Sequence, residues 1–556
     1  MNILFFCFFY FFVLFFIRGF LIFLNKAIFK KNIKVDELKV FNIDLIYFYP
    51  ILFLFLIGNL TLILNFFVAQ KHLKLFQLIF TLFIVLFNLI EKVQIHEKIK
   101  LFFIVFIPLI LSVSTYGQRL HLDTIDYHLI SQKWIIENKI SFGLTNIYNA
   151  LGWATLFEYI QANFWINNNY SYLHYINVLF FVNFFHFVIA SAIQNVNKIL
   201  KFSSINLIIF SFFDNFGVGG GGNSFLKFQS IGKPDLAAGI LFIISNLLLI
   251  QAIKNVNSKN GNISYIEFHL ICILVIFSFQ VKITNIVTIF LFLYFIFYLS
   301  KLKKIKIFIN LIAYFFLSIL FLLKNFIISG CLIFPVSISC ISKLPWSNKD
   351  EVVNWGNQVR YYNFALNLER IKNLDQWYFE WINNAYNKQI YFNYLVSIII
   401  IFLIRIIFTH KDYERKNKIK LIYLNSIYIF SFLLFGPTER YGFGILSLLV
   451  STVGLSRIKL KVSINENFLK KFVISLSILC VILTPRMYSY KTFLEYRFEN
   501  YIVNVPNSLY KPTIGWGYLT LSKGDHCIIK LNCFREYKNL KLIVRNSYLF
   551  FQNEQN

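Results

Sequence analysis

The stretch DLIYFYPILFLFLIGNLTLILNFFV fills residues 44–68, and Asp44 is its only charged residue. About 20 consecutive apolar residues allow an α-helix to cross the hydrocarbon core of a bilayer. The stretch therefore predicts a transmembrane helix. It decides the fold class because comparable apolar runs recur along the chain, at 3–24, 74–91, 101–114, 173–194, 204–216, 235–253, 264–280, 283–300, 305–328, 390–409, 420–435, 441–456 and 470–484.

The composition of the 556-residue chain excludes the soluble and the disordered classes of protein. Hydrophobic residues make up 58% of the chain and charged residues 14%, against roughly 45–50% and about 25% in soluble domains. Disordered chains need low hydrophobicity, which this sequence lacks. We predict an all-α polytopic membrane protein with about 14 transmembrane helices.

The net charge of +28 lies in short loops between the apolar runs, which argues against nucleic-acid binding. Short basic loops of membrane proteins face the cytoplasm. Every second loop is short and basic, whereas the others are less basic, at 115–172, 214–234, 329–389, 436–440 and 485–556. We therefore predict a membrane domain over 1–484, with long external loops at 115–172 and 329–389, and an external C-terminal tail over 485–556.

The first long external loop contains His121-Leu-Asp123-Thr-Ile-Asp126-Tyr127-His128. Two carboxylates and two histidines thus lie within eight residues of a charge-poor chain. A carboxylate at a membrane surface beside aromatic rings has a raised pKa, which suits a general base acting on a sugar or lipid-head hydroxyl. Asp126 is the first candidate for this base and Asp123 the second. His121, Tyr127 and His128 are candidate substrate-binding residues.

Two other interpretations of this motif stay open. Residues 128–138 and 150–164 are predicted as two short surface helices, and Asp126 would then serve as the N-cap of the first. Histidine and aspartate at this spacing are also metal ligands. No further cluster completes a metal site, so we expect no metal cofactor. Lys133 lies on the first of these helices and is a further candidate for substrate binding.

A glycine-rich segment, GVGGGGNS at 217–224, has the glycine spacing of a nucleotide phosphate loop. Such a loop needs a lysine where Asn223 stands, and it follows a strand rather than a membrane helix. We therefore exclude a nucleotide site in this segment.

Several charged residues are predicted to reach the same external face. Ammonium and guanidinium groups there suit the phosphate of a lipid carrier. Solvated lysines near lipid headgroups and a Glu439–Arg440 ion pair are the alternatives. We predict a shared external cavity, for which the candidate substrate-binding residues are Lys227, Lys233, Asp235, Lys282, Glu439, Arg440 and Tyr441.

Two cysteine pairs and the tail complete the external side. Cys331 shares one external loop with Cys340, and Cys527 shares the tail with Cys533. An oxidising compartment permits two disulfides, with free thiols as the alternative. The tail is a candidate lid over the cavity. The tryptophans of the 329–389 loop suit anchoring at the membrane interface better than sugar contact.

The order of these segments resembles that of bacterial GT-C-type glycosyltransferases, polytopic enzymes that transfer sugars from polyprenyl-phosphate donors. In that family an acidic residue of the first external loop, followed by two surface helices, is the catalytic base. The resemblance implies this role for Asp126, with Asp123 second, and a carrier-phosphate role for Arg440. Four apolar runs precede the loop here, whereas one helix precedes it in the family. The resemblance is carried by Asp123–Trp134, Gly143–Asn146, Lys233–Asp235, Ser329–Pro335 and Pro437–Gly442.

The resemblance implies a glycosyltransferase of the bacterial inner membrane that works in cell-envelope polysaccharide synthesis. Its partners would be a polyprenyl-phosphate sugar donor and a glycan or lipid acceptor on the periplasmic face. Two alternatives remain. An O-antigen polymerase or ligase is disfavoured because the 329–389 loop contains no histidine. A polysaccharide or lipid transporter is disfavoured because transporters place charged residues at the membrane midplane, and the apolar runs are nearly free of acidic residues.

Overall fold

The computed structural model describes most of the chain, with gaps between the described segments. The described residues are 2–28, 34–91, 93, 98–116, 123–165, 171–194, 198–216, 232–257, 263–301, 311–364, 383, 385–407, 426–433, 439–453, 466–495, 512–516, 519–522, 533–534, 540–545 and 548–553.

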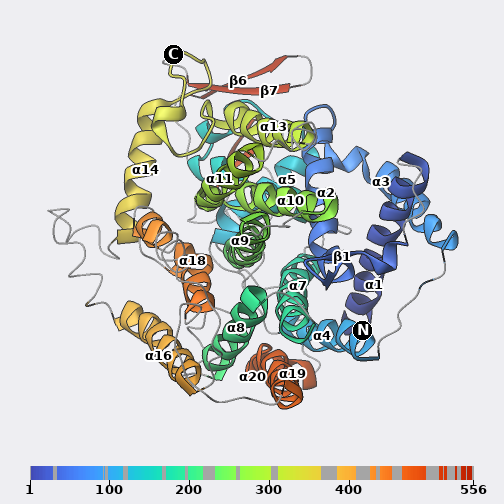
Figure 1. The fold of residues 1–556 in the computed structure, drawn as a ribbon. Helices are drawn as coiled ribbons and strands as arrows, with labels where there is room; N and C mark the ends of the chain where they lie inside the picture. The colour runs from blue at the N-terminus through green and yellow to red at the C-terminus, as the bar shows by residue number, and fades with distance from the viewer. Residues whose placement is uncertain are drawn as a thin grey trace.

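The described residues form mostly α-helices, which gather around a central group made of α7, α8, α9 and α10 (Figure 1). In chain order the helices are α1 (Asn2–Phe23), α2 (Tyr49–Asn65), α3 (Lys74–Leu86), α4 (Lys98–Ser112), α5 (Leu129–Glu137), α6 (Leu156–Ala162), α7 (His174–Ile193), α8 (Lys198–Phe216), α9 (Asp235–Asn257), α10 (Tyr265–Val281), α11 (Val287–Lys301), α13 (Leu311–Ser329), α14 (Lys349–Phe364), α16 (Ala385–Ile407), α18 (Glu439–Thr452), α19 (Glu466–Leu483) and α20 (Met487–Leu494).

Short strands complete the fold, so the all-α prediction is correct for most of the membrane domain, which has one short strand pair, but not for the tail. Strand β1 (Lys39–Val40) pairs antiparallel with β2 (Ile43–Asp44). In the tail, β3 (Pro512–Trp516), β4 (Leu519–Ser522) and β5 (Cys533–Phe534) form one sheet. The antiparallel hairpin of β6 (Leu540–Arg545) and β7 (Tyr548–Asn553) forms another.

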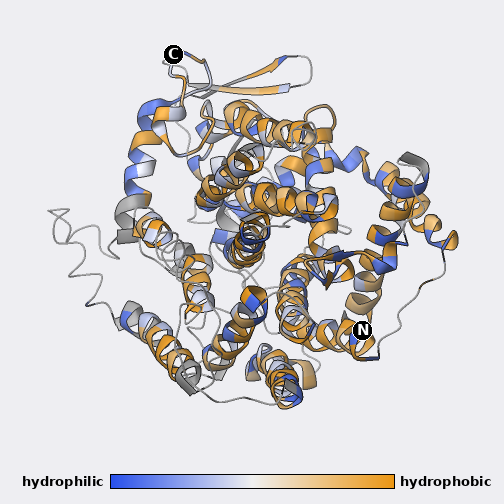
Figure 2. Ribbon diagram, in the orientation of Figure 1, coloured by the Kyte–Doolittle hydropathy of each residue, from blue (hydrophilic) through white to orange (hydrophobic). Residues whose placement is uncertain are grey.

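The apolar helices differ in how much of their surface other parts of the chain cover. The spans of α7 and α9 are each 94% buried, whereas those of α11 and α13 are 28% buried. A helix that is apolar on all sides is stable only inside protein or in lipid. Figure 2 shows this apolar character over most helices and a more polar α14. Helices α7 and α9 therefore form the core, and α11 and α13 present apolar side chains outward.

The number of membrane-spanning helices corrects the prediction from the sequence. Among the described residues, seven helices are long and apolar enough to span a membrane, or up to eight if α19 and α20, bent by 63°, form one broken span. The predicted 14 spans included helices that are too short, such as α3 and α18, of 13 and 14 residues. Helix α8 is longer but carries Lys198, Lys201 and Asp214. The chain is a helical membrane protein with fewer such spans than predicted.

The first external loop is folded more deeply than its sequence suggested. Helix α5 confirms the helix predicted over 128–138, but nearly all its side chains are buried rather than at a surface. The helix predicted over 150–164 is divided into a 3₁₀ turn over Asn149–Trp153 and the short α6. Thr155 is the N-cap of α6 and stops the two from joining. Neighbouring elements cover both helices, so neither helix needs a polar face toward water.

The C-terminal hairpin packs on this loop. Phe142 donates from its backbone N–H to Leu549 O at 2.8 Å and accepts from Phe551 N at 3.0 Å. The ring of Phe551 contacts Trp134 with centroids 5.8 Å apart. Trp134 is therefore buried under the tail. The described part of the tail covers the loop, and a lid over a cavity stays a prediction.

One predicted disulfide is present, between Cys331 and Cys340 after the end of α13. Phe334 inside this disulfide loop packs against Gly152, where an added Cβ would lie 2.8 Å from the Phe334 ring. The loop is thereby attached to the first external loop. Cys527 lies outside the described residues, so the second pair stays a prediction.

Arg18 is a buried charge inside the first membrane span. It is 4% exposed, and Nε and Nη2 donate to the two carboxylate oxygens of Asp36, each at 2.8 Å. Nη1 donates to Asn88 Oδ1 at 3.1 Å and to Glu91 O at 3.2 Å. The bidentate Arg18–Asp36 pair joins α1 to the segment that follows it. The bonds to Asn88 and Glu91 join α1 to the end of α3. The short basic loops lie at this end of the helices.

Asp36→Ala is expected to lower the free energy of unfolding by roughly 3–5 kcal/mol, because it leaves a buried guanidinium without its counter-charge. Glu37→Ala is the matched control, since Glu37 pairs with Lys34 where both side chains are 64% exposed. An exposed pair contributes no more than about 1 kcal/mol. Unfolding of both variants in detergent micelles measures the difference. Equal losses would contradict a special role for the buried pair.

Candidate functional site

The motif of the first external loop folds as one continuous helical segment. Residues Thr124–His128 form a π-helical turn that leads directly into α5. Asp126 therefore lies inside a helical turn and not at an N-cap position, which removes the capping interpretation. The side chain of Asp126 lies outside the part of the chain that the structure describes.

His128 and Glu158 form a buried acid–base pair. His128 Nδ1 lies 2.6 Å from Glu158 Oε1, and the two residues are 3% and 1% exposed. Glu158 is the third residue of α6, where its Oε2 accepts from Thr155 N at 2.6 Å and from Thr155 Oγ1 at 2.7 Å. This capping box fixes the carboxylate. The carboxylate in turn fixes the imidazole ring.

Lys324 brings a third charge to this pair from α13. Its side chain is fully buried, and Nζ donates a hydrogen bond to Ala154 O just before α6. The ammonium also interacts electrostatically with Glu158. A buried ammonium is stable only with such compensation, so Lys324 and Glu158 depend on each other.

The segment before α9 closes over His128. Gly232 has φ +85°, and a Cβ at that position would lie 2.4 Å from His128 Cβ. Only glycine fits both this backbone conformation and this close approach. The next residue, Lys233, places Nζ 3.5 Å from Asp123 Oδ2. Two motifs that are more than 100 residues apart in the sequence are thus in contact.

A second ion pair lies two residues further along. Asp235 is the first residue of α9, and its carboxylate accepts from Lys282 Nζ. Lys282 lies between α10 and the 3₁₀ turn that precedes α11, which confirms the predicted helix break. Asn285, in that turn, donates to Ala238 O of α9 at 2.9 Å. The break between α10 and α11 therefore places the ammonium group of Lys282 at the start of α9.

We call Asp123, His128, Glu158, Lys233, Asp235, Lys282 and Lys324 the polar cluster. The described cluster holds three carboxylates and three lysine side chains, together with the imidazole of His128. No group of three or more His, Cys, Asp or Glu suitable for a metal ion occurs among the described residues.

The other predicted residues stand in three groups. Tyr127 lies beside the cluster, with its ring centroid 4.2 Å from that of His128. Lys133 instead bonds Glu137 Oε1 at 3.1 Å, on the following turn of α5. His121 and Lys227 lie outside the described residues. For Glu439, Arg440 and Tyr441 the structure describes only the backbone, at the start of α18.

The start of α18 lies near the start of α9. A Cβ on Gly239 of α9 would lie 1.8 Å from the Phe443 ring, and one on Gly444 would lie 2.9 Å from Phe242. The two helices therefore pack closely at this point. Arg440 lies about one helical turn before Phe443, and Asp235 lies about one helical turn before Gly239. Both residues are therefore about one turn before the contact between the two helices.

Sequence reasoning missed Glu158 and Lys324 as members of the site. The Thr155-x-x-Glu158 spacing is a sequence signal for a capping box, but it does not show that the glutamate also holds a histidine. An ionisable residue in an apolar run, as Lys324 is, is by itself a signal for function. Neither signal names the partner.

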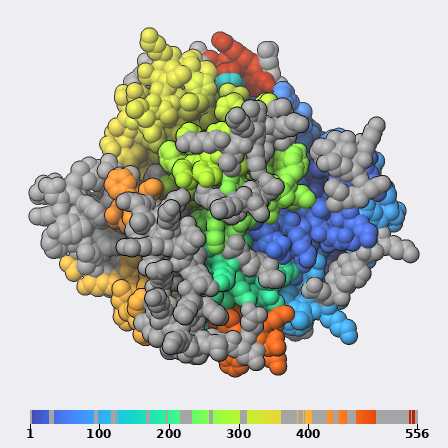
Figure 3. All heavy atoms as spheres, in the orientation of Figure 1, coloured from blue at the N-terminus to red at the C-terminus, as the bar shows by residue number. Residues whose placement is uncertain are grey.

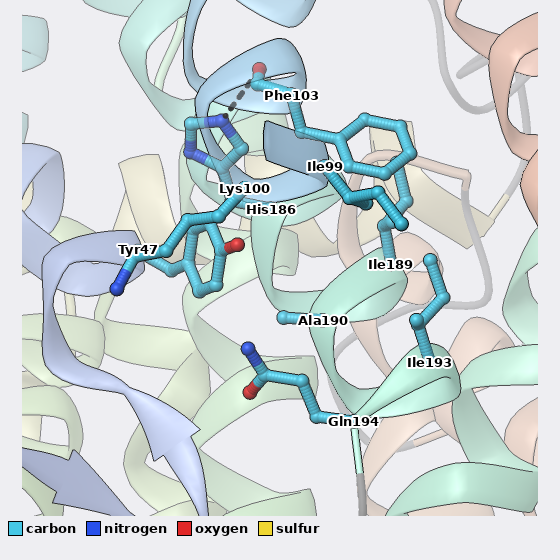
Figure 4. A pocket seen from close by; sticks show the side chains of 9 residues that line it. All are labelled: Tyr47, Ile99, Lys100, Phe103, His186, Ile189, Ala190, Ile193 and Gln194. Atoms are coloured by element: carbon cyan, nitrogen blue, oxygen red, sulfur yellow. Dashed lines mark hydrogen bonds between the residues drawn. The ribbon is translucent and has the colours of Figure 1, made fainter. Parts of the chain in front are cut away.

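A pocket of about 30 Å³ lies far from the polar cluster, at the C-terminal end of α7 (Figure 4). Its polar wall includes Lys100, His186 and Gln194, and His186 Nε2 lies 3.3 Å from Phe103 O. Phe157, next to Glu158, packs on Phe180, six or more residues before the α7 residues of the pocket. A volume of this size holds a few waters. It is too small for a sugar phosphate.

Glu137 supplies a test of the electrostatics of α5. Burial alone raises the pKa of Glu137, but hydrogen bonds from Lys71 and Lys133 outweigh it and lower the pKa below its ordinary value. A carboxyl whose pKa is lowered by folding stabilises the native state above its unfolded pKa, and this stability is lost as the pH falls through the folded pKa.

Glu137→Gln is therefore expected to be less stable than the wild type at pH 6–8, with the difference vanishing as the pH approaches about 3. Thermal unfolding of both proteins across this pH range measures the difference. A difference that persists unchanged at pH 3 would contradict the ionic origin of the stabilisation.

No curated protein and no solved structure matches this chain. The sequence model of one family, described as "Domain of unknown function (DUF8201)", matches residues 1–447. The matched part contains every residue of the polar cluster and excludes the C-terminal tail. Because the match covers more than half of the 556 residues, the chain belongs to the DUF8201 family.

Proposed function

We propose that this protein is a membrane glycosyltransferase of GT-C type. It transfers a sugar from a polyprenyl-phosphate-linked donor to a glycan or lipid acceptor, at the periplasmic face of the bacterial inner membrane. The observation that carries the proposal is the joining of the acidic motif of the first external loop to two lysines, through Asp123–Lys233 and Asp235–Lys282. Carboxylates beside cations are what proton abstraction and phosphate departure require.

The position of the cluster supports an external site. The opposite ends of the helices carry the short basic segments, where Lys100 pairs with Asp44 at 3.1 Å and Lys26 with Glu91 at 3.6 Å. Short basic segments face the cytoplasm. The polar cluster then lies on the outer side, where nucleotide sugars are absent and a lipid-linked donor is the available substrate.

The proposed reaction assigns a task to each group. Asp126 or Asp123 accepts the proton of the acceptor hydroxyl, and the acceptor oxygen forms a bond to the anomeric carbon. The bond from that carbon to the phosphate oxygen breaks, and the electron pair leaves with the polyprenyl phosphate. Lys233, Lys282 and Arg440 balance the charge of the departing phosphate. The proposal includes no metal, since side-chain cations supply this charge.

Asp126→Asn and Asp123→Asn distinguish the two candidate bases. Loss of a general base typically lowers the rate about 10²- to 10⁴-fold. We expect this loss in one of the two variants when purified protein in nanodiscs is given lipid extract with polyprenyl-linked sugars. Mass spectrometry follows the disappearance of the lipid-linked sugar and the release of polyprenyl phosphate.

Asp350→Asn is the matched control, because Asp350 is exposed in the first turn of α14 and is no part of the polar cluster. It should retain wild-type turnover. Equal consumption by the wild type and both loop variants would exclude these aspartates as the base. Binding of the lipid-linked sugar without consumption by any protein would contradict transfer and favour a transporter.

A further inference from the structure

His128 is held in one orientation by its surroundings. Glu158 bonds Nδ1 on one edge, the backbone of Gly232 lies against Cβ, Cγ and Cδ2, and the Tyr127 ring lies beside the imidazole. An imidazole so confined cannot turn to exchange its two nitrogens. Its other nitrogen, Nε2, therefore has a fixed direction.

That nitrogen is buried and has no hydrogen-bond partner among the described residues. A buried polar atom without a partner is unfavourable, and such atoms in native proteins point to function or to a bound group. In the imidazolium form Nδ1 donates to Glu158, and Nε2 also carries a proton and can only donate. The complementary ligand is an anion with an acceptor oxygen.

The charges of the polar cluster specify how such an anion is balanced. Asp123 is paired with Lys233, Asp235 with Lys282, and Glu158 lies near Lys324, so the described carboxylates and lysines of the cluster are equal in number. A singly charged phosphodiester would leave this cluster with one unbalanced negative charge. A proton on His128 restores neutrality.

We propose that His128 Nε2–H binds the phosphate of the lipid-linked substrate, and that binding takes up one proton at this imidazole. The inference rests on the proposed function and names the phosphate contact of that site. Glu158 is a positioning residue, because it orients the imidazole and stabilises its charge. Lys324 acts in turn on Glu158.

This role is compatible with the transfer reaction. When the bond between the anomeric carbon and the phosphate oxygen breaks, the electron pair moves to the phosphate. The imidazolium hydrogen bond stabilises the charge that develops there. The proton of the acceptor hydroxyl goes to the aspartate of the loop, so His128 retains its own proton. No co-reactant is needed.

Glu158 of α6 and Tyr127 contact His128, and the further charged groups of the cluster on the neighbouring elements are Lys324 of α13, Lys233 before α9 and Asp123 of its own segment. Histidine is the side chain that ordinarily changes its charge between pH 5 and 8. Binding that requires the imidazolium therefore weakens as the pH rises through this range. Once the free imidazole is neutral, the apparent Kd rises about tenfold per pH unit.

The test measures binding of a farnesyl methyl phosphodiester to the full-length protein in nanodiscs between pH 5 and 9. This probe keeps a single negative charge over the whole range, so any pH dependence comes from the protein. We expect binding to the wild type to weaken with rising pH. For His128→Gln we expect pH-independent binding that is about 10- to 100-fold weaker at pH 5, the loss typical of a charged hydrogen bond.

Two further variants separate binding from folding. Glu158→Gln keeps a side chain that suits the capping box but removes the negative charge. It should bind the probe more weakly than the wild type at pH 5, because the charge that pairs with the imidazolium is lost. His186→Gln replaces another buried histidine, at the far end of α7 (Figure 4), and should bind as the wild type does.

The outcomes distinguish this inference from the proposed function. Binding that is independent of pH in the wild type, or equally pH-dependent in His128→Gln, overturns the role of His128 and leaves sugar transfer standing. Absence of probe binding while lipid-linked sugar is still consumed also overturns the phosphate contact alone. Absence of both binding and consumption removes the proposed function together with the inference.

Discussion

The carboxylate of Glu158 joins three separate segments at the end of the molecule that holds the polar cluster. It bonds His128 of the loop motif, caps its own helix through Thr155, and lies near the ammonium of Lys324 from α13. A carboxylate that is 1% exposed is stable only when each of these partners is present. The positions of α6, of the motif and of the end of α13 are therefore mutually dependent, and the rest of the polar cluster is built next to them.

Directional polar contacts set which helices are neighbours in the rest of the membrane domain. Aromatic and aliphatic side chains fill the core, but apolar packing in a lipid environment is permissive about partners. Asn59 of α2 and Gln280 of α10 bond each other at 2.9 Å, and Asn246 of α9 bonds Thr288 of α11 at 3.0 Å. With the Arg18–Asp36 pair at the opposite end, these bonds fix the order in which the helices pack.

The external side is a layer of its own. The first external loop lies between the membrane helices and the C-terminal hairpin, and the disulfide loop is attached to it through Phe334. Figure 3 shows the red hairpin next to the yellow region of α14 on the outer surface. Helices expected at a membrane surface are thus interior elements, because residues hundreds of positions away cover them. Because these distant residues cover the loop, the loop can hold buried charges in fixed positions.

The sequence by itself determined what depends on local patterns: a helical membrane protein, the helix of the loop motif and the break at Lys282. Apolar run length and loop charge are properties of single segments, so they can be read in order along the chain. The tertiary structure decided the pairing of His128 with Glu158, the place of Lys324 and the smaller number of long apolar helices. Lys324 and the carbonyl of Ala154 are 170 residues apart. Such contacts arise only when whole helices pack, because burial of a charge selects its partner in space and leaves no spacing in the sequence.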